Sequence, residues 1–569
     1  MKPGWTLRRL AILRAKASCL WIFQALWVVM FVFASSAKAD DEAGVMKNAF
    51  DPLNASILEM QAAIGSGRFT TRELVEFYLQ RIDAQDPLLN SIARTNKTAL
   101  DTAEELDRER VLKGIRSPLH GIPVLVKDNY ETFDMPTSAG SRALEGFFPK
   151  RDAFLVQRLR DAGAIILGKT NMHEFSYGIT TVGSAFGASH NPDDIQRNPG
   201  GSSGGTGAAI ASNFAAVGMG SDTCGSIRIP ASHNNLVGLR GTQGLASRTG
   251  IIPLSHTQDI GGPLARSVMD LALVLDVTVG VDPLDAQTAD GFGHTPESYA
   301  AGLNEGALRG ARLGLLEDLL RIDAEDEEVA LVVEQAANEM RALGAIVERV
   351  RVDDLQSLIS TRIDGFFVLI RDFKQDINAY LADNPEAGVG SLSEILERGD
   401  YHPAIEESLR ASEAMDDASV LEYLEELHNR ERLRQAITGL MAAKRLDALL
   451  YPTIRRKPTL IGETQPGSNC RLAANSGLPA ISVPAGFTPD GLPVGIELLG
   501  VAWDEAKLLN LAYAFEQATR HRRAPLFESP VNDDLSDQPD PAPATNGPEP
   551  VDRHEEPLEA PIKEATSDG

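Results

Sequence analysis

Cysteine, aromatic residues and basic side chains are all scarce in this chain of 569 residues. It contains three cysteines and 6% aromatic residues, and 54 Lys and Arg stand against 80 Asp and Glu. So few cysteines exclude the disulfide framework of a small secreted domain. The net charge of −26 disfavours partners such as nucleic acid and anionic membrane surfaces. A hydrophobic content of 43% is enough for a sizeable globular core.

The glycine-rich segment and the histidines also lack the usual ligand-binding motifs. The glycine-rich segment at residues 198–244 does not end in the Gly-Lys-Ser/Thr that cradles nucleotide phosphates. The histidines lack the His-x-x-x-His and His-Glu-x-x-His spacings of zinc ligands. We therefore predict no metal and no cofactor. Structural or surface roles are expected for the histidines considered, which are His120, His173, His190, His233 and His256.

The first 39 residues differ in character from the rest. Basic side chains precede an apolar run at residues 20–34, and Ala37-Lys38-Ala39 follows it. This pattern is typical of a secretory signal peptide cleaved after Ala39, and the run is short for a membrane-spanning helix. We expect a periplasmic or secreted protein with no membrane contact after cleavage. Because six basic and no acidic residues leave with the signal, the net charge would shift from −26 to −32.

Two cysteines remain after such cleavage, because Cys19 lies in the signal peptide. Cys224 and Cys470 could pair in an oxidising compartment. A free cysteine is among the most frequently buried residue types. We therefore expect both to remain small buried thiols.

The chain from residue 40 to residue 530 alternates helical and strand patterns. Thr70 and Glu73 have the spacing of a helix-capping box, and residues 153–160 are helix-patterned. This alternation favours an α/β fold with a largely buried sheet. The strand-like runs occupy residues 122–126, 164–167, 480–483 and 494–499.

Two segments depart from this alternation. Residues 288–445 are rich in long, charged, helix-patterned stretches, and we predict that they form a mainly helical insertion in the domain. Residues 531–569 carry 11 acidic and two basic side chains among many prolines. Such a composition cannot bury enough apolar surface to fold, which predicts a disordered acidic tail.

Glycines cluster between residues 198 and 244, interleaved with apolar residues that a flexible linker would lack. Gly201 to Gly205 fit the Gly-x-Ser-x-Gly pattern of a nucleophile elbow, with Ser203 at its centre. An elbow should follow an apolar strand, whereas residues 189–199 are polar and rich in turn-forming residues. A serine hydrolase with Ser203 and a histidine base stays open as an alternative.

The whole glycine-rich segment, with its Gly-Gly-Ser-Ser-Gly-Gly and Asp-Thr-Cys-Gly-Ser-Ile-Arg stretches, resembles the amidase signature family. The likeness spans residues 50 to about 525 and is nearest to secreted peptide amidases. It implies a single large domain, a mixed β-sheet sandwiched between helices, and a small amide or peptide-amide substrate; it leaves a homodimer open. Further matching motifs lie at residues 121–129, 168–171, 251–259, 477–486 and 491–503.

The resemblance assigns roles to particular residues. It implies that Lys127, Ser202 and Ser226 are catalytic and that the Gly201–Ser202 peptide bond is cis. It places the oxyanion hole at Thr223, Cys224 and Gly225, with Ser203, Asp222 and Arg228 in support. The family usually has glycine where Cys224 stands.

The chemistry of amide hydrolysis requires the residue types that the resemblance assigns, a serine nucleophile and a lysine base. A serine hydroxyl attacks an amide only with a strong base beside it, and a lysine is neutral near pH 7 only if burial lowers its pKa by roughly three units. Ser202 would relay the proton of Ser226 to Lys127, and an acyl-enzyme would form. We predict an exported amidase that releases ammonia or an amine. A catalytically inactive periplasmic binding protein with this fold is the other alternative.

Overall fold

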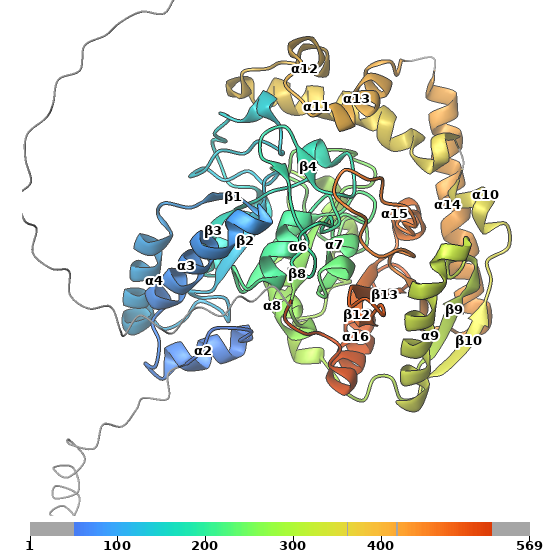
Figure 1. Cartoon of the computed structure of the whole chain (residues 1–569), viewed down its shortest axis with the longest axis horizontal. Helices are drawn as coiled ribbons and strands as arrows, with labels where there is room; N and C mark the ends of the chain where they lie inside the picture. Colours follow the sequence, from blue (N-terminus) through green and yellow to red (C-terminus); the bar gives the residue numbers. More distant parts are fainter. Residues whose placement is uncertain (1–49, 361, 417–418, 526–569) are drawn as a thin grey trace, which may run out of the picture. The chain divides into compact units, whose positions relative to one another are not determined.

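The computed structural model describes residues 50–360, 362–416 and 419–525 (Figure 1). The predicted signal peptide at residues 1–39 and the predicted tail at residues 531–569 lie outside these ranges. Among the residues that are described, no helix is long and apolar enough to cross a bilayer.

A mixed sheet of eleven strands forms the centre of the domain, in the order β1-β3-β2-β6-β8-β7-β12-β13-β11-β9-β10. The neighbours β3, β2 and β6 are parallel, as are β11, β9 and β10, and the other pairs are antiparallel. All four predicted strand runs are confirmed, in β2, β3, β12 and β13. The strands of this sheet are β1 (Ile92–Thr95), β2 (Pro123–Lys127), β3 (Ile165–Thr170), β6 (Val217–Ser221), β7 (Val237–Arg240), β8 (Gly261–Ala265), β9 (Arg312–Leu316), β10 (Ile346–Val350), β11 (Ala448–Pro452), β12 (Ala480–Phe487) and β13 (Pro493–Leu499). A separate two-stranded ribbon pairs β4 (Val182–Gly183) with β5 (Gly187–Ala188).

Helices cover the sheet on both faces. Along β11, Ala448 and Leu450 belong to one apolar cluster with α9, while Leu449 and Tyr451 belong to another with α14. This alternation follows from the period of two along a strand, and it confirms a sheet sandwiched between helices. The α-helices are α2 (Ile57–Gly65), α3 (Thr71–Leu89), α4 (Ala99–Lys113), α5 (Phe154–Asp161), α6 (Gly204–Ala211), α7 (Arg228–His233), α8 (Val268–Thr278), α9 (Glu327–Ala342), α10 (Leu355–Ile359), α11 (Phe367–Asp383), α12 (Leu392–Arg398), α13 (Glu406–Glu413), α14 (Val420–Lys444), α15 (Arg471–Ser476) and α16 (Glu505–Thr519).

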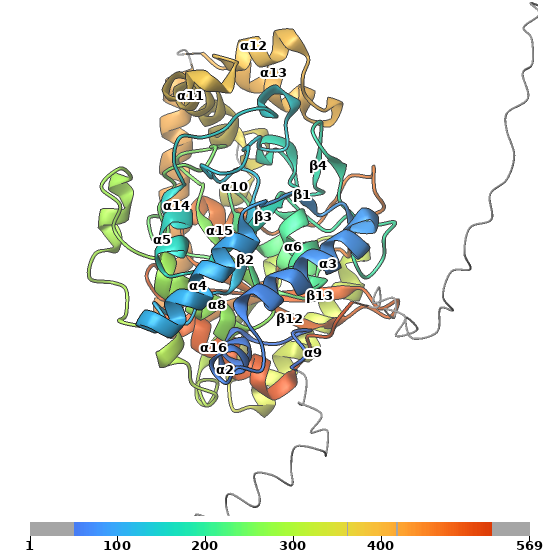
Figure 2. The ribbon, with the colours of Figure 1, turned by 90° about the vertical axis from the view of Figure 1, so that its left-hand side faces the viewer.

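The β1 edge of the sheet lies beside the helix pair α3 and α4 (Figure 2). Helix α3 begins with the predicted capping box: the Thr70 side chain accepts from the backbone N–H of Glu73, and the Glu73 carboxylate accepts from the N–H of Thr70. Both terminal N–H groups are thereby satisfied. The short helix predicted at residues 153–160 is confirmed as α5.

The prediction of a helical insertion over residues 288–445 is wrong for its first part. That part contains β9 and β10, which α9 connects and which extend the main sheet in parallel beside β11. Strand β10 lies at the sheet edge, where Glu348 and Arg349 face ion-pair partners rather than a core. Its polar composition therefore hid the strand pattern, since edge strands often carry charge. Helices α10 to α14 make up the remainder.

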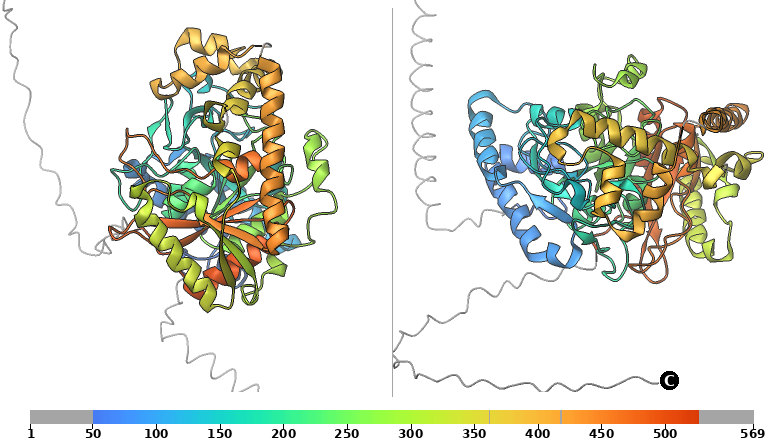
Figure 3. Two further views of the ribbon diagram at one scale, coloured as in Figure 1. Left: turned by 90° about the vertical axis from the view of Figure 1, so that its right-hand side faces the viewer. Right: turned by 90° about the horizontal axis from the view of Figure 1, so that it is seen from above.

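Helices α11, α12 and α13 gather together beyond one end of the sheet, and the long helix α14 runs from this group along the domain (Figures 1 and 3). Phe373 and Ile377 of α11 pack in a separate apolar cluster with Phe175 and Leu254 of the main domain. The helical layer is thus joined by apolar packing to the loops that follow the central strands. It forms one wall of the cavity described next.

Candidate active site

Lys127 is the last residue of β2 and is fully buried. Because β2 and β6 are parallel neighbours, their carboxyl ends meet, and Ser221 ends β6 beside the lysine. The Lys127 Nζ lies 2.7 Å from Ser202 Oγ and 2.8 Å from Ser221 Oγ. It also lies 3.3 Å from Ser176 Oγ and 3.4 Å from the Ser221 carbonyl oxygen. Hydroxyl and carbonyl oxygens therefore surround the amine, and no carboxylate of residues 50–360, 362–416 or 419–525 forms an ion pair with it.

This surrounding changes the acidity of the lysine. Burial lowers the pKa of Lys127 to about 7, against the weaker opposing effect of the Asp259 and Asp222 carboxylates. The charged form loses hydration that neutral oxygens replace only in part. A neutral lysine is therefore abundant near pH 7, as the sequence predicts for a base.

The two serines assigned to catalysis lie on loops that the backbone ties together. The Gly201–Ser202 peptide bond is cis, which confirms that prediction. The Ser203 N–H donates to the Ser226 carbonyl at 3.2 Å, which joins the loop before α6 to the loop before α7. A Cβ built on Gly205 would lie 2.3 Å from the Asn171 carbonyl oxygen, so only glycine lets α6 approach this close.

Ser203 has a different environment from Ser202. Its buried hydroxyl donates to the Ser221 carbonyl at 3.2 Å and accepts from the Ser221 N–H at 3.3 Å. Ser203 is also absent from the cavity lining described below. Its hydroxyl therefore braces the end of β6, which supports the predicted supporting role and not the role of a nucleophile.

A cavity of about 430 Å³ opens between the central loops and the helical layer. Ser226 lines it together with Ser176, and apolar side chains of α11 form the facing wall. Such a mixture of apolar walls and a few polar groups is typical of a small-molecule site. Its lining residues are Ser176, Tyr177, Gly178, Ile179, Thr223, Cys224, Ser226, Leu254, Ile363, Phe366, Leu369, Ile370, Glu407, Ser408, Ala411, Ser468 and Cys470.

Free backbone donors occur in the loop beside Ser226. In the described part of the chain, the N–H groups of Thr223, Cys224 and Ser226 donate to no other residue. Buried N–H groups are seldom left unpaired, so these three are candidate donors to a bound ligand. The Gly225 N–H instead donates to Asp222 Oδ1 at 2.8 Å. The assignment of Gly225 to the oxyanion hole stays a prediction, and the N–H of Ser226 is a further candidate donor.

Asp222 and Arg228 hold this loop, as the resemblance implies. The Asp222 carboxylate accepts from the Gly225 N–H, from the Ile227 N–H at 3.1 Å and from Arg228 Nε at 3.1 Å. Burial alone would raise the pKa of Asp222, but the guanidinium groups of Arg228 and Arg240 hold it well below its usual range. Arg228 in turn donates to the Glu497 carboxylate at 2.5 Å. This buried network keeps charge paired and the loop in one conformation.

Several residues of the site were not singled out from the sequence. Thr223 Oγ1 donates to Asp259 Oδ1 at 2.5 Å, and Gln258 Nε2 donates to the Thr223 carbonyl at 3.2 Å. Asp259 and Gln258 belong to the matched motif at residues 251–259, so the motif itself was the available signal. Ser221 carries no such signal, because a serine at a strand end is common.

The expectation of two free thiols is wrong: Cys224 and Cys470 form a disulfide bond. The two residues are 246 positions apart in the sequence, and their Cα atoms lie 5.0 Å apart. Packing of α15 against the loop before α7 brings them together. Both cysteines line the cavity beside Ser226.

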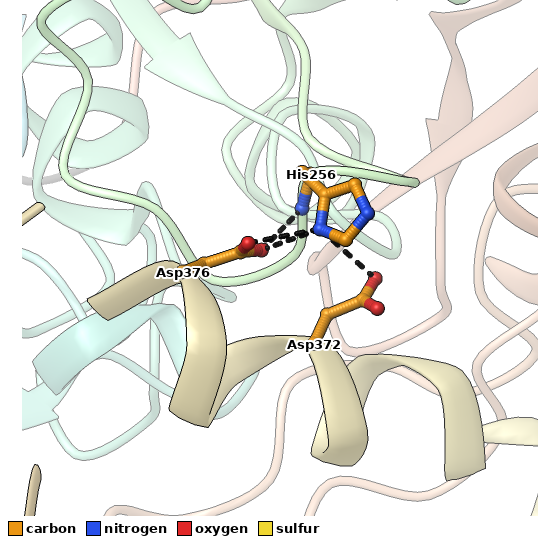
Figure 4. Close-up of side chains that lie close together, drawn as sticks. All are labelled: His256, Asp372 and Asp376. Atoms are coloured by element: carbon orange, nitrogen blue, oxygen red, sulfur yellow. Dashed lines mark hydrogen bonds and ion pairs between the residues drawn. The ribbon is translucent and has the colours of Figure 1, made fainter. Parts of the chain in front are cut away.

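His256, Asp372 and Asp376 form a cluster of possible metal ligands (Figure 4). The His256 Nδ1 lies 2.9 Å from an Asp376 carboxylate oxygen and 3.9 Å from Asp372 Oδ2. The Asp372 carboxylate already accepts the hydroxyl groups of Ser255 and Thr257, at 2.6 and 2.7 Å. The hydrogen bond to Asp376 raises the pKa of His256. The cluster is therefore explained as a link between the 251–259 segment and α11, and the absence of a metal stays a prediction.

The mixed sheet between helices makes this an α/β protein, and its buried lysine contacts serine hydroxyls at the strand ends. Comparison with known proteins identifies the family to which the chain belongs. Residues 73–509 match the Amidase family. A probable amidase of Arabidopsis thaliana is 34% identical over 500 residues, covering 85% of this chain and 93% of the plant protein.

A solved structure and a second relative also resemble the chain over most of its length. The peptide amidase of Stenotrophomonas maltophilia is 38% identical with a TM-score of 0.77, covering 84% of this chain and 99% of that one. A glutamyl-tRNA(Gln) amidotransferase subunit of Thermus thermophilus is 36% identical over 494 residues, covering 83% of this chain and 99% of the Thermus protein. The chain belongs to the amidase family and is a hydrolase of the kind that acts on amide C–N bonds.

Proposed function

We propose that this amidase hydrolyses carboxamides with Ser226 as the nucleophile and with Ser202 and Lys127 as its proton relay. The observation that carries the proposal is the contact of 2.7 Å between Ser202 Oγ and a fully buried Lys127 amine. A general base works best when its pKa lies near the working pH. Lys127, with a pKa of about 7, meets that requirement.

The contacts of Lys127 fit the role of base. In the neutral amine, the two N–H bonds have acceptors at the Ser221 hydroxyl and carbonyl oxygens. The lone pair is then left for the hydroxyl hydrogen of Ser202. No hydrogen bond between the Ser202 and Ser226 hydroxyls is present among the described residues; such bonds often tighten only in the substrate complex. The relay would be completed there.

Acyl transfer would follow in two balanced steps. Ser226 Oγ bonds to the amide carbon while its proton passes to Ser202 and the Ser202 proton passes to Lys127. The oxyanion takes hydrogen bonds from the free N–H groups at Thr223, Cys224 and Ser226. When the C–N bond breaks, the proton returns through the relay to the leaving nitrogen. Water repeats the sequence on the acyl-enzyme and releases the carboxylic acid.

The cavity supports an apolar acyl group beside the scissile bond, because Leu254, Phe366 and Leu369 contribute to its walls. The peptide amidase among the relatives supports peptide amides as one such class. We expect a screen of primary amides, anilides and peptide amides to find the highest kcat/KM with an apolar acyl group and a small leaving amine. Measurement of ammonia against amine release identifies the product. Equal kcat/KM for acetamide and for the apolar amides would contradict this assignment.

The alternatives have less support. A Ser203 nucleophile lacks cavity access and has its hydroxyl bonded to the backbone of Ser221. A binding protein without catalysis would have no need of a buried lysine beside Ser202 whose pKa is lowered to about 7. A fluorophosphonate probe tests both alternatives, since we expect covalent labelling at Ser226 and at no other serine.

The rate should depend on pH through Lys127. Protonated Lys127 cannot accept a proton, so kcat/KM should rise tenfold per pH unit below about 7 and level off above it. A profile of kcat/KM between pH 5 and 9 measures this, with stability checked across the range. A maximum below pH 6 would contradict the lysine as base.

We also propose that the enzyme is exported. The basic and apolar N-terminal segment with its cleavage-like site supports export. The Cys224–Cys470 disulfide supports it independently, because such bonds persist in oxidising compartments. The protein recovered from a bacterial periplasm or medium should begin at Asp40, by N-terminal sequencing. Replacement of Ala39→Arg should block this cleavage; recovery of a cell-retained, uncleaved wild-type chain would refute export.

A further inference from the structure

The disulfide lies in the loop that carries the free N–H groups, two residues before Ser226. Thr223 and Gly225 flank Cys224 and are held by hydrogen bonds, to Asp259 and to Asp222 respectively. Cys224 itself makes no hydrogen bond to any residue in the described ranges. Among the described residues, the bond to Cys470 and apolar packing with Ala474 and Phe366 are therefore what holds the Cys224 side chain between its two anchored neighbours.

The other end of the disulfide is firmly attached. The Cys470 carbonyl accepts from Arg228 at 3.4 Å and from the Ala474 N–H of α15 at 3.1 Å. The preceding residue, Asn469, donates to the Pro452 carbonyl at 2.7 Å, which fixes it to the end of β11. Cys470 thus belongs to the rigid sheet side of the cavity, and the disulfide extends that rigidity to Cys224.

We propose that the Cys224–Cys470 disulfide positions the oxyanion-binding N–H groups, so that the oxidised enzyme turns over faster than the reduced one. The inference rests on the proposed function. Donors aimed at the developing oxyanion must be in place before the reaction, because reorganising them adds to the barrier. A dithiol such as dithiothreitol would exchange with the bond, leaving two protein thiols and the oxidised cyclic reagent. Cys224 would then lose its covalent link to Cys470 and keep only its two anchored neighbours and apolar packing.

A disulfide that only stabilised the fold would leave the kinetics of the folded enzyme unchanged. A disulfide that positions the N–H groups should change kcat. Interactions made only in the transition state change kcat, whereas uniform substrate binding changes KM. Loss of one oxyanion donor reduces kcat by roughly 10²- to 10³-fold in a serine hydrolase. Donors that are displaced rather than deleted should lower kcat by at least about tenfold, with KM changed by less than about threefold.

The experiment uses the mature enzyme and the double variant Cys224→Ala/Cys470→Ala, which leaves no thiol. In the double variant, kcat should be at least about tenfold lower. The variant should also bind an aldehyde analogue of a good substrate at least about tenfold more weakly. The aldehyde forms a tetrahedral adduct whose oxygen needs the same N–H groups. Affinity for the carboxylic acid product should stay within about threefold. Unchanged kcat and unchanged aldehyde affinity would overturn the proposal.

Reduction of the wild-type enzyme gives a second, independent measurement if the double variant does not fold. The disulfide-bonded fraction is followed by alkylation and mass spectrometry during dithiothreitol treatment, with near-ultraviolet circular dichroism as the check of folding. Turnover should fall in proportion to that fraction and return on reoxidation. Full turnover with the bond reduced would overturn the proposal. Where the double variant does fold, the reagent should leave its turnover unchanged, and it then serves as the control.

Failure of this inference is distinguishable from failure of the proposed function. If Ser226 is not the nucleophile, the oxidised wild-type enzyme already lacks fluorophosphonate labelling at that residue. If only the disulfide inference fails, the oxidised enzyme is active and labelled, and the double variant matches it.

Discussion

Replacement of Ser226 by alanine should lower kcat/KM by at least about 10⁴-fold, because the acyl-enzyme can no longer form. Ser226 is buried, with 3% of its surface exposed, and lines the cavity beside the free N–H groups. The variant should stay folded, since its hydroxyl accounts for none of the loop's hydrogen bonds while its backbone carbonyl still accepts from Ser203. Steady-state kinetics on the best amide, with thermal unfolding as the folding check, measures this.

Ser203→Ala is the matched control, one residue from Ser202 in the same glycine-rich loop. Among the residues that the structure describes, its hydroxyl forms hydrogen bonds with the backbone of Ser221 alone. We therefore expect a loss of no more than about tenfold, together with a lower melting temperature. Fluorophosphonate labelling should persist in Ser203→Ala and vanish in Ser226→Ala. The reverse pattern, with full turnover in Ser226→Ala, would return the assignment to Ser203.

The sequence identified the three proposed catalytic residues through motifs rather than through their contacts. Lys127 and Ser202 are 75 positions apart, and only the pairing of β2 with β6 and the loop before α6 brings Nζ to 2.7 Å from Oγ. Chemical need predicted the lowered pKa of Lys127, because an unactivated lysine could not serve as base. The cis Gly201–Ser202 bond came from the resemblance alone and is confirmed.

Contacts between residues far apart in the chain could not be predicted from the sequence. The Cys224–Cys470 pairing spans 246 positions, and nothing local to either cysteine encodes the other's place in space. The same holds for Arg228 and Glu497, whose contact crosses from α7 to β13. Hydrogen bonds within the loop of residues 222–227 could not be predicted either. Gly225 belongs to the matched motif, but the motif does not indicate that its N–H donates to the Asp222 carboxylate.

Four strands that are largely buried were predictable from the sequence, whereas β6, β7, β8 and β11 were not singled out although they are equally buried. Strands β2, β3, β12 and β13 are almost wholly apolar in their buried positions, and their runs were recognised. Strand β10 is half exposed at the sheet edge. Because its neighbouring positions Glu348 and Arg349 are both charged, apolar and polar residues do not alternate along it, and the sequence does not predict a strand there. Its neighbour β9 is as long as β2 and mostly buried, but it lies in a segment dominated by helical patterns, which led to the wrong insertion boundary.

The second large effect is expected at Lys127. Both Lys127→Met and Lys127→Arg should lower kcat/KM by at least about 10³-fold, since Met carries no base and Arg stays protonated at any working pH. The arginine variant is the informative control, because it keeps a positive charge near Ser202. Retention of activity in Lys127→Arg would mean that charge, and not proton transfer, is what the site requires.

Lys127 also makes the enzyme's stability depend on pH. Its pKa is about 7 when folded and ordinarily 10.5, so between these values the unfolded chain binds more protons and stability rises with pH. This one group contributes up to about 1.4 kcal/mol per pH unit in that window. In Lys127→Met the contribution is absent, so the difference in unfolding free energy between wild type and variant should move in favour of the wild type from pH 7 to pH 10. Denaturant unfolding at pH 7, 8.5 and 10 measures it. A difference that is constant over this window would show that Lys127 keeps its ordinary pKa, and the same residue would then be too protonated at neutral pH to act as the base.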